Sequence, residues 1–538
     1  MSLTPQDRPV FGPVFALLAV LMGVGGLWLA EAFGAALGAL ELAALGGVLI
    51  LAVLPALCAG SARISDHLVA GRAVGPLENA LALIAQWVSG GVLLAAAARF
   101  DGAPLALYSA AWTAGFLLLA VLLAPYLNKA CAATVPSFLA RRYGGGLIRP
   151  LTVVVVAAVA LPLLSVQLQI VGILIERALA AASIVGLPGY TLGVWGAVLA
   201  VLALVVPGGL GSLTPAQTGL AVLILVAVAA PALAPWWAAP VSALPTPQSL
   251  PAESLPAESL PVEGNPVEAL ALAFTLALGT AAMPALLDRA LATPTVRAAR
   301  FSAVWALLGV ALVLVAVRAS APVDPVSSAE VASLAGALGA GLPMALVALV
   351  VAAVLAAALS SAGGLAANLA NTLSHDIGFH TFAPGMAPKE RVRLTRLFQI
   401  AVLGVAGLAA QATPPEDLGA TLLYGVSLAA SALFAPLVLG IWDRRTTAPG
   451  ALAGMLGGVA TVALWAWVAQ VGLDGLAASG DEGALLGLDP SLAGVLGAPL
   501  SLVLTWGVSR LTLSPGDAAE DYVDELRIPR GRAVSPYR

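Results

Sequence analysis

The sequence predicts an all-α polytopic membrane protein with about 14 transmembrane spans. Of its 538 residues, 60% are hydrophobic and 10% are charged, and its mean hydropathy is +0.99. Soluble domains carry about 25% charged residues, so this composition indicates a chain that lies mostly in lipid. The sequence holds no Walker A loop, Rossmann fingerprint or metal-ligand spacing. We therefore expect neither an enzyme, nor an ATP-driven pump, nor a nucleic-acid partner.

The predicted spans follow one another along the chain, separated by polar or Pro/Gly-rich breaks. At about 1.5 Å of rise per residue, roughly 20 apolar residues cover a hydrocarbon core of roughly 30 Å. The spans lie at residues 11–31, 41–60, 75–98, 104–125, 150–175, 190–208, 214–238, 267–286, 300–320, 343–373, 395–413, 419–441, 449–471 and 493–513. The first span is long and only Arg8 precedes it as a basic residue, which favours an uncleaved anchor over a cleaved signal peptide.

The basic residues of the short loops predict the orientation, because cytoplasmic loops are enriched in Lys and Arg. Alternate loops hold Arg63, Arg72, Lys129, Arg141, Arg142, Arg149, Arg289, Arg297, Arg300, Lys389, Arg391, Arg393, Arg396, Arg444 and Arg445. The opposite loops are acidic or neutral, and the Pro/Glu-rich loop at 239–266 is typical of a flexible external spacer. The sequence therefore predicts a multi-pass protein of the cell (inner) membrane with both termini in the cytoplasm.

Two adjacent serines, Ser360 and Ser361, stand near the middle of the span at 343–373. Two interpretations are open. The serines can bond back to carbonyls four residues earlier or act as small residues at a helix contact. Alternatively, they can face the polar stretch AQWVSGG at 85–91, where a loosened helix would free carbonyls, and the two segments together would cage a small cation.

Two interrupted spans predict an internal repeat. The polar, Gly-containing stretches 86–91 and 279–284 each lie in the first span of a group of five. Interrupted spans at corresponding positions of two halves indicate an inverted-repeat transporter. The predicted organisation is two N-terminal flanking spans at 1–60, a first five-helix repeat at 75–238, the external loop at 239–266, a second five-helix repeat at 267–441, two C-terminal spans at 449–513 and a cytoplasmic tail at 514–538. We expect that charged tail to be exposed or disordered.

The polar side chains inside the spans are the candidates for a central solute cavity. Each alone is typical of helix packing, but together they favour a cavity. The candidates are Gln86, Ser89, Gln167, Gln169, Thr280, Tyr424 and Ser427. No Asp, Glu, Lys, Arg or His falls near a predicted midplane. This pattern favours a metal-ion driving force, or an uncoupled facilitator, over proton coupling.

The motifs of the chain resemble the bacterial sodium/solute symporter family, and within it the acetate-permease-like monocarboxylate branch. They are SDHLVAGRAVGPLENALA at 65–82, LAPYLNKACAATVPSFLARRYGG at 123–145, GTAAMPALLDRALATPTVRAARFSAVW at 279–305, LAAALSSAGGLAANLANTLSHD at 355–376 and SLAASALFAPLVLGIWDRR at 427–445. The resemblance implies the five-plus-five inverted-repeat fold with flanking helices. It also implies sodium held by the carbonyls of Ala85, Val88 and Ala357 and the hydroxyls of Ser360 and Ser361.

The chain departs from the pattern of that branch at several positions. Gln86 stands where relatives typically carry a carboxylate, and Asp288 stands where they commonly carry an apolar residue. The sequence nonetheless predicts a sodium-coupled importer of a small organic solute, such as acetate, that works by alternating access in a lipid bilayer with no other cofactor. The alternatives are an uncoupled facilitator and a non-transporting sensor or partner subunit that keeps the fold.

Overall fold

The protein is all-helical throughout the part of the chain that the computed structural model describes. That part comprises residues 11–93, 104–182, 186, 188–233, 266–320, 343–412, 418–471 and 488–528. Nearly all of the predicted external loop at 239–266 lies outside these residues, which include only its last residue. The predicted division into two repeats therefore stays a prediction at its boundaries.

The first half of the chain forms the helices that carry the predicted spans up to residue 238. These are α1 (Phe11–Ala32), α2 (Leu37–Cys58), α3 (Ile64–Val69), η1 (Ala70–Arg72), α4 (Pro76–Trp87), α6 (Pro104–Leu118), η2 (Leu119–Leu123), α7 (Ala124–Ala130), α8 (Val135–Tyr143), α9 (Ile148–Ala181), α10 (Gly189–Val205) and α11 (Leu210–Leu233). Segment η2 is π-helical, whereas η1 is a 3₁₀ turn.

The second half continues in the same way. Its helices are α12 (Pro266–Ala282), α13 (Pro284–Leu291), α14 (Val296–Ser320), α16 (Met344–Thr372), η4 (Leu373–Phe382), α17 (Pro388–Ala412), α18 (Leu418–Ala429), η5 (Ala430–Phe434), α19 (Ala435–Trp442), α20 (Ala448–Val471), η6 (Pro490–Leu492), α21 (Gly494–Leu511) and α22 (Asp517–Arg527). Segments η4 and η5 are π-helical.

The helices account for the predicted spans. Twelve helices of the described residues are long and apolar enough to cross a membrane, and the bent pair of Ile64–Arg72 and Pro76–Trp87 gives up to 13. The predicted span at 190–208 corresponds to α10, an apolar helix of only 17 residues. At about 1.5 Å per residue, α10 is about 25 Å long, which is slightly short of a typical hydrocarbon core.

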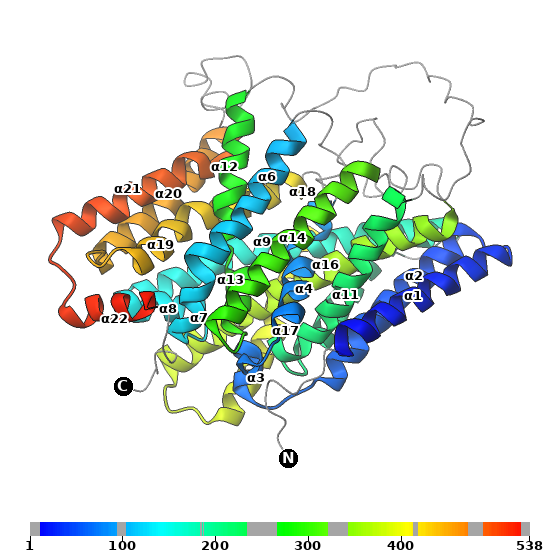
Figure 1. Ribbon diagram of the computed structural model, residues 1–538, viewed down its shortest axis with the longest axis horizontal. Helices are drawn as coiled ribbons and strands as arrows, with labels where there is room; N and C mark the ends of the chain where they lie inside the picture. The colour runs from blue at the N-terminus through cyan, green and yellow to red at the C-terminus, as the bar shows by residue number, and fades with distance from the viewer. Residues whose placement is uncertain are drawn as a thin grey trace.

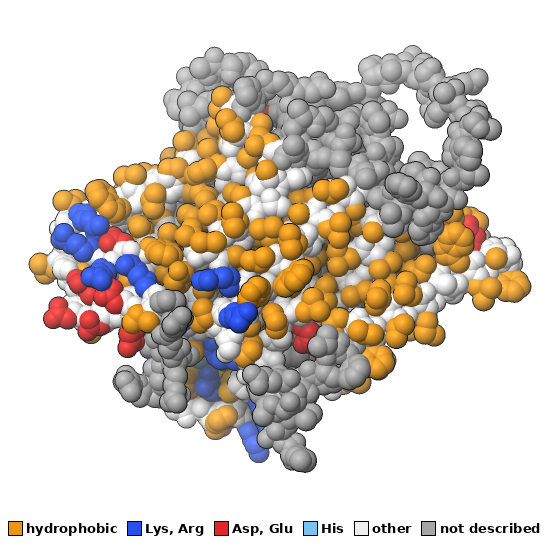
Figure 2. Space-filling view, in the orientation of Figure 1, with side chains coloured by type: hydrophobic (Ala, Val, Ile, Leu, Met, Phe, Trp, Pro, Cys, Tyr) orange, Lys and Arg blue, Asp and Glu red, His pale blue; other side chains and the backbone are white. Residues whose placement is uncertain are grey.

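The arrangement places the flanking helices on the outside of a central bundle. Figure 1 shows α1 and α2 at one side, α20 and α21 at the opposite side, and the other long helices between them. Helix α16 is the central element, because all but two of its 29 residues are buried. By contrast, hydrophobic side chains of α14 such as Trp305 and Val315 are exposed, and Figure 2 shows such side chains covering most of this face. That outer surface suits contact with lipid tails.

Helices α20 and α21 approach each other through small residues. Gly450 and Gly454 lie four residues apart on α20, and Gly458 continues the same face. Side-chain or backbone atoms of Thr505 and Ser509 on α21 fill the space that a Cβ of Gly450 or Gly454 would need. Such close backbone approach is typical of helix pairs that associate inside lipid.

The basic loops meet at one end of the helices. The Arg72 guanidinium donates to the carbonyls of Ala132 at 2.6 Å and Leu291 at 3.2 Å. The Arg142 guanidinium donates to the carbonyl of Gly440 at 2.8 Å. Loops far apart in the sequence therefore lie on the same side of the molecule, as the alternation of basic loops predicts.

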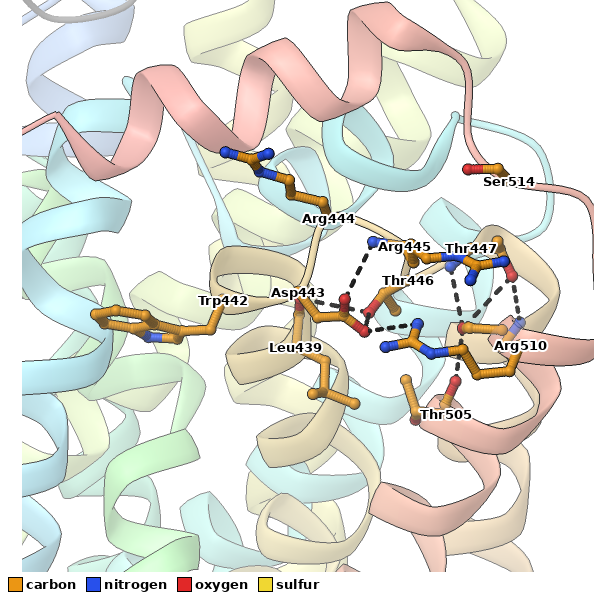
Figure 3. Close-up of polar contacts among 12 residues, drawn as sticks. Leu439, Trp442, Asp443, Arg444, Arg445, Thr446, Thr447, Thr505, Arg510 and Ser514 are labelled. Atoms are coloured by element: carbon orange, nitrogen blue, oxygen red, sulfur yellow. Dashed lines mark hydrogen bonds and ion pairs between the residues drawn. The ribbon is translucent and has the colours of Figure 1, made fainter.

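Polar contacts fix the short connection between α19 and α20 at this end. Figure 3 shows the carboxylate of Asp443 between the Arg510 guanidinium, at 3.1 Å, and the backbone amide of Arg445, also at 3.1 Å. The Thr446 hydroxyl donates to the same carboxylate at 3.0 Å. Burial acts to raise the pKa of Asp443, but these hydrogen bonds outweigh it and leave the pKa below its usual value. Asp443 therefore stays ionised and ties α21 to the end of α19.

The tail after α21 is folded rather than disordered up to Ile528. Helix α22 buries Val523 and Leu526, which are 0% and 1% exposed, against the core. The Tyr522 ring lies under the Arg141 guanidinium at 4.9 Å, and burial raises the pKa of Tyr522 to about 12. The sequence predicts a tail that is exposed or disordered, and the structure agrees with the first alternative up to Ile528, because most of α22 is exposed or half-buried. The three-residue spacing of Val523 and Leu526 places both on one helix face.

Truncation of Leu526 is expected to release α22 from the bundle. Leu526→Ala removes a buried side chain, a change that typically costs about 2–5 kcal/mol. Amide hydrogen exchange of residues 517–527, followed by mass spectrometry, is therefore expected to become at least tenfold faster. Asp521→Asn, on the exposed face of α22, serves as the control. Equal exchange in the two variants would show that Leu526 does not hold the helix.

Candidate functional site

A break in the helix that begins with α4 starts the site. Helix α4 ends at Trp87, Val88 and Ser89 are not helical, and the helix resumes at residue 90. The Ser89 amide donates to the Trp87 carbonyl at 2.7 Å instead of to Ala85. The Val92 amide donates to the Ser89 hydroxyl at 3.1 Å instead of to Val88. The carbonyls of Ala85 and Val88 thus lose the donors that a continuous helix would supply.

The break lies slightly later than the sequence suggests. The resemblance and the geometry place the loosened segment at 85–88, but Ala85 remains inside α4. The Gln167 side chain of α9 stabilises the break, because its Oε1 accepts from the Gly90 amide at 3.1 Å. Gly90 makes this packing close, since a Cβ would lie only 3.2 Å from the Ala358 side chain of α16. The break therefore packs directly against the serine-bearing helix.

A second break occupies the corresponding position in the other half. Helix α12 ends at Ala282, Met283 has an extended conformation with φ −62° and ψ 114°, and α13 begins at Pro284. A backbone N–H at the first position of a helix has no partner within the helix. Proline has no N–H, so it suits this position. The interrupted stretch predicted at 279–284 is confirmed as a broken helix.

The serines of α16 lie inside the protein. Ser360 is 0% exposed and Ser361 is 5% exposed. The Ser360 hydroxyl has no hydrogen-bond partner, so it does not bond back to a carbonyl four residues earlier. A buried hydroxyl without a partner is rare and requires an explanation such as a bound ion or water. Ala357 remains in the regular part of α16, where a carbonyl keeps a second lone pair available.

A cavity of about 140 Å³ lies beside the two breaks. Five neutral polar side chains line it: Gln86, Ser89, Gln167, Thr280 and Ser361. The apolar lining is Trp87, Gly91, Val92, Trp112, Leu163, Leu272, Leu276, Met283, Ala285, Leu286, Leu365, Gly419, Leu422, Leu423 and Val426. None of these lining residues is charged. The cavity can therefore enclose a small solute that is mainly apolar and has one polar end.

Three of the predicted solute residues lie elsewhere. Gln169 is buried and makes a side-chain hydrogen bond with Tyr190 of α10. The Ser427 hydroxyl donates to the Ser491 carbonyl. Tyr424 packs with the small hydrophobic cluster next to α20 and α21. A polar residue in a span marks a buried position, but its direction depends on the rotation of the helix, which the sequence does not specify.

Sequence reasoning missed a buried arginine behind the cavity wall. Arg289 of α13 is 0% exposed. Its guanidinium donates to the Gln86 Oε1 at 3.1 Å, to the Thr214 hydroxyl at 2.8 Å and to the Gln217 Oε1. The Gln217 amide in turn donates to the Ser360 carbonyl at 2.9 Å. One guanidinium therefore connects the wall of the cavity with the backbone of α16.

This arrangement corrects one expectation from the sequence. Arg289 was expected in a basic loop. Helix α13 instead continues the broken span to Leu291 and buries both Asp288 and Arg289. The signal that could have identified Arg289 is the run Leu286–Leu291 around it, which is too apolar for a loop.

Comparisons with known proteins place this fold in a family. A model of the sodium:solute symporter family matches residues 67–458. An uncharacterised symporter from Cupriavidus necator is 29% identical over 177 residues, which cover 30% of this chain and 24% of the relative. The chain therefore matches only about a quarter of that relative's length.

The solved structure of a sodium symporter shares the transporter fold of this chain. A Na⁺-coupled sialic acid symporter in a substrate-bound outward-open state has a TM-score of 0.63 and 14% identity, and the match covers 90% of this chain and 98% of that one. Mhp1, a nucleobase-cation-symport-1 family transporter in a closed conformation, has a TM-score of 0.48 and 13% identity, with 85% and 98% coverage. At 14% identity, the likeness to the sialic acid symporter shows the fold alone.

Removal of the Ser361 hydroxyl is expected to weaken sodium binding. A hydrogen bond to a charged group contributes about 1.5–3 kcal/mol, and a comparable loss here corresponds to about tenfold or more in affinity. Equilibrium binding of radioactive sodium to the purified Ser361→Ala variant measures this change. Ser165→Ala is the matched control, because the Ser165 hydroxyl bonds the carbonyls of Leu161 and Ala406. Unchanged sodium affinity in Ser361→Ala would return Ser361 to a role in helix packing.

Proposed function

Because the chain belongs to the sodium:solute symporter family, we propose that it imports a small monocarboxylate, such as acetate, together with sodium by alternating access. The observation that carries the proposal is the break at Val88 and Ser89, which packs against the helix that bears the partnerless Ser360 hydroxyl. Family membership supports sodium-coupled transport in general. The identity of the solute and the residues that hold each ligand are the proposal.

The proposed sodium site consists of five oxygen atoms. The carbonyls of Ala85 and Val88 have lost their helical donors, and the Ala357 carbonyl and the hydroxyls of Ser360 and Ser361 lie on α16. Residues 357, 360 and 361 share one helix face because they are three and four positions apart. Oxygen ligands without thiolate or imidazole suit a hard cation such as sodium.

The proposed solute site is the cavity beside this set of oxygens. Ser361 belongs to both, since it lines the cavity and is a predicted sodium ligand. A bound cation would therefore sit next to the solute, and its charge would attract a carboxylate. Drug-sized pockets measure roughly 300–1,000 Å³, so a cavity of about 140 Å³ suits a solute of few heavy atoms.

The proposed carboxylate binding relies on neutral donors as well as on the cation. Ser89 and Thr280 supply hydroxyls in the cavity. The Gln86 amide already donates to the Ala285 carbonyl at 2.7 Å, so one N–H of Gln86 remains for a solute. Arg289 stands behind Gln86 and adds positive potential without touching the cavity. The remaining predicted residues, Gln169, Tyr424 and Ser427, do not line this cavity and are left out of the proposed site.

The proposed orientation places the basic end of the bundle in the cytoplasm. The Lys- and Arg-bearing loops meet at that end, and cytoplasmic loops are the basic ones. Both termini would then lie in the cytoplasm of a cell with the protein in its inner membrane.

Counterflow of labelled acetate in proteoliposomes tests the function. Acetate exchange is expected to require sodium on the side from which acetate enters, and an inward sodium gradient is expected to drive its accumulation. Acetate exchange that is independent of sodium would identify a facilitator. Absence of exchange with acetate and with other short monocarboxylates would contradict the proposed solute class.

Two glutamines of one helix test the location of the solute site. Gln167→Met removes a polar group from the cavity and from the Gly90 amide, so the acetate concentration for half-maximal uptake is expected to rise about tenfold. Gln169→Met is the matched control with the same change on the same helix, and its solute dependence is expected to stay at the wild-type value. A rise in Gln169→Met with none in Gln167→Met would place the solute on the other face of α9.

A further inference from the structure

The carboxylate of Asp288 has no role in the proposed transport site. Asp288 lies in α13 and is 3% exposed, and its neighbour Asn368 of α16 is 2% exposed. The Asn368 amide donates to the Asp288 Oδ2 at 2.7 Å. The other carboxylate oxygen, Oδ1, is buried without a hydrogen-bond partner, and so is the Oδ1 of Asn368. Two oxygen acceptors of touching side chains are therefore left unsatisfied.

The surrounding charges do not explain these atoms. Arg289 is the next residue, but its guanidinium bonds Gln86, Thr214 and Gln217. No ion pair joins Arg289 to Asp288, both of which are described in full. The charged groups that act on Asp288 over a distance are Arg289 and Asp376. Buried charges in proteins are paired or bind ions, so a carboxylate with one neutral donor is an incomplete site.

The position of the pair connects it to the cavity. Ala285 and Leu365 both line the cavity, and Asp288 and Asn368 follow them by three residues each, which is about one helical turn. Asn368 also follows Ser361 by seven residues, or two turns of the same face of α16, at about 10 Å. The pair thus lies one turn beyond the edge of the cavity, on the helix that carries the proposed sodium ligands.

We propose that Asp288 and Asn368 form a second cation site, separate from the proposed sodium site at Ser360 and Ser361. A carboxylate oxygen and an amide oxygen are ligands for a hard cation. The positive charge of Arg289 opposes a divalent ion, so the site takes a monovalent cation, either Na⁺ or H⁺. The next polar atoms of this face, Asn371 Oδ1 and Thr372 Oγ1, are also buried without partners and continue the row away from the cavity.

This inference rests on the proposed function in one respect, because the cation reaches Asp288 from the cavity. The test uses purified full-length protein and measures cation binding in the absence of solute. Equilibrium binding of radioactive sodium gives the number of ions per chain, and a pH-sensitive dye in weakly buffered solution reports protons released when sodium is added. Asp288→Asn is the central variant, since its amide oxygen can still accept from Asn368.

If the second cation is sodium, the wild type is expected to bind two sodium ions per chain. At the same sodium concentration, Asp288→Asn and Ser361→Ala are each expected to bind one sodium ion fewer.

If the second cation is a proton, the wild type is expected to bind one sodium ion and to release a proton. Asp288→Asn is then expected to bind sodium without releasing a proton. Equal sodium stoichiometry in the wild type and Asp288→Asn, with no proton release by either, would overturn the second site.

Controls separate this outcome from a fault in the protein or in the proposed function. Glu41→Gln changes another fully buried carboxylate, one that Arg177 pairs at 3.0 Å, and is expected to keep the wild-type values. Asn368→Leu carries the test if Asp288→Asn does not elute as a folded protein, and it is expected to show the same loss. A wild type that binds no sodium would contradict the proposed sodium site as well. A wild type that binds sodium with the same stoichiometry as Asp288→Asn, without proton release, would contradict only the site at Asp288.

Discussion

The constraint on which the rest of the structure depends is that lipid offers no hydrogen bonds to a polypeptide backbone. Continuous helices meet this constraint, and a helix can break inside the bilayer only where protein groups replace the missing bonds. The break after α4 is such a place. The Ser89 hydroxyl accepts from the Val92 amide, Gln167 accepts from the Gly90 amide, and the Trp87 carbonyl accepts from the Ser89 amide. These three amides keep a partner, whereas the carbonyls of Ala85, Gln86 and Val88 lose their helical donors.

The polar interior beside this break is organised around one cation of the protein itself. Arg289 is held by neutral oxygen atoms of Gln86, Thr214 and Gln217. Two of the positions at which the sequence departs from the pattern of the branch it resembles are linked to Arg289: Gln86 accepts from its guanidinium, and Asp288 precedes it in α13. The buried group therefore contains one cationic and one acidic side chain that do not form an ion pair with each other.

The sequence predicts the helices well and the directions of their side chains less well. Hydropathy locates every long span, and the Gly- and Ser-rich stretches locate the breaks, because both signals are local. Arg289 was misassigned because counting basic residues treats each arginine as a loop residue, whereas its partners Thr214 and Gln217 are over 70 positions away in the sequence. Gln167 and Gln169 illustrate the remaining difficulty. They are two residues apart on one helix, which places them on different faces, and nothing local says which face meets the cavity.

The close packing of α20 on α21 has a consequence for the biogenesis of the protein. The two helices meet through Gly450 and Gly454, and such contacts need only van der Waals fit between two neighbouring segments. The pair can therefore associate as soon as both segments have left the ribosome and entered the bilayer. The breaks and buried charges of the other helices need partners from distant parts of the chain. Their polar groups are therefore satisfied only once those helices have assembled. The last pair is thus free to dock as a finished hairpin onto a core that is already closed.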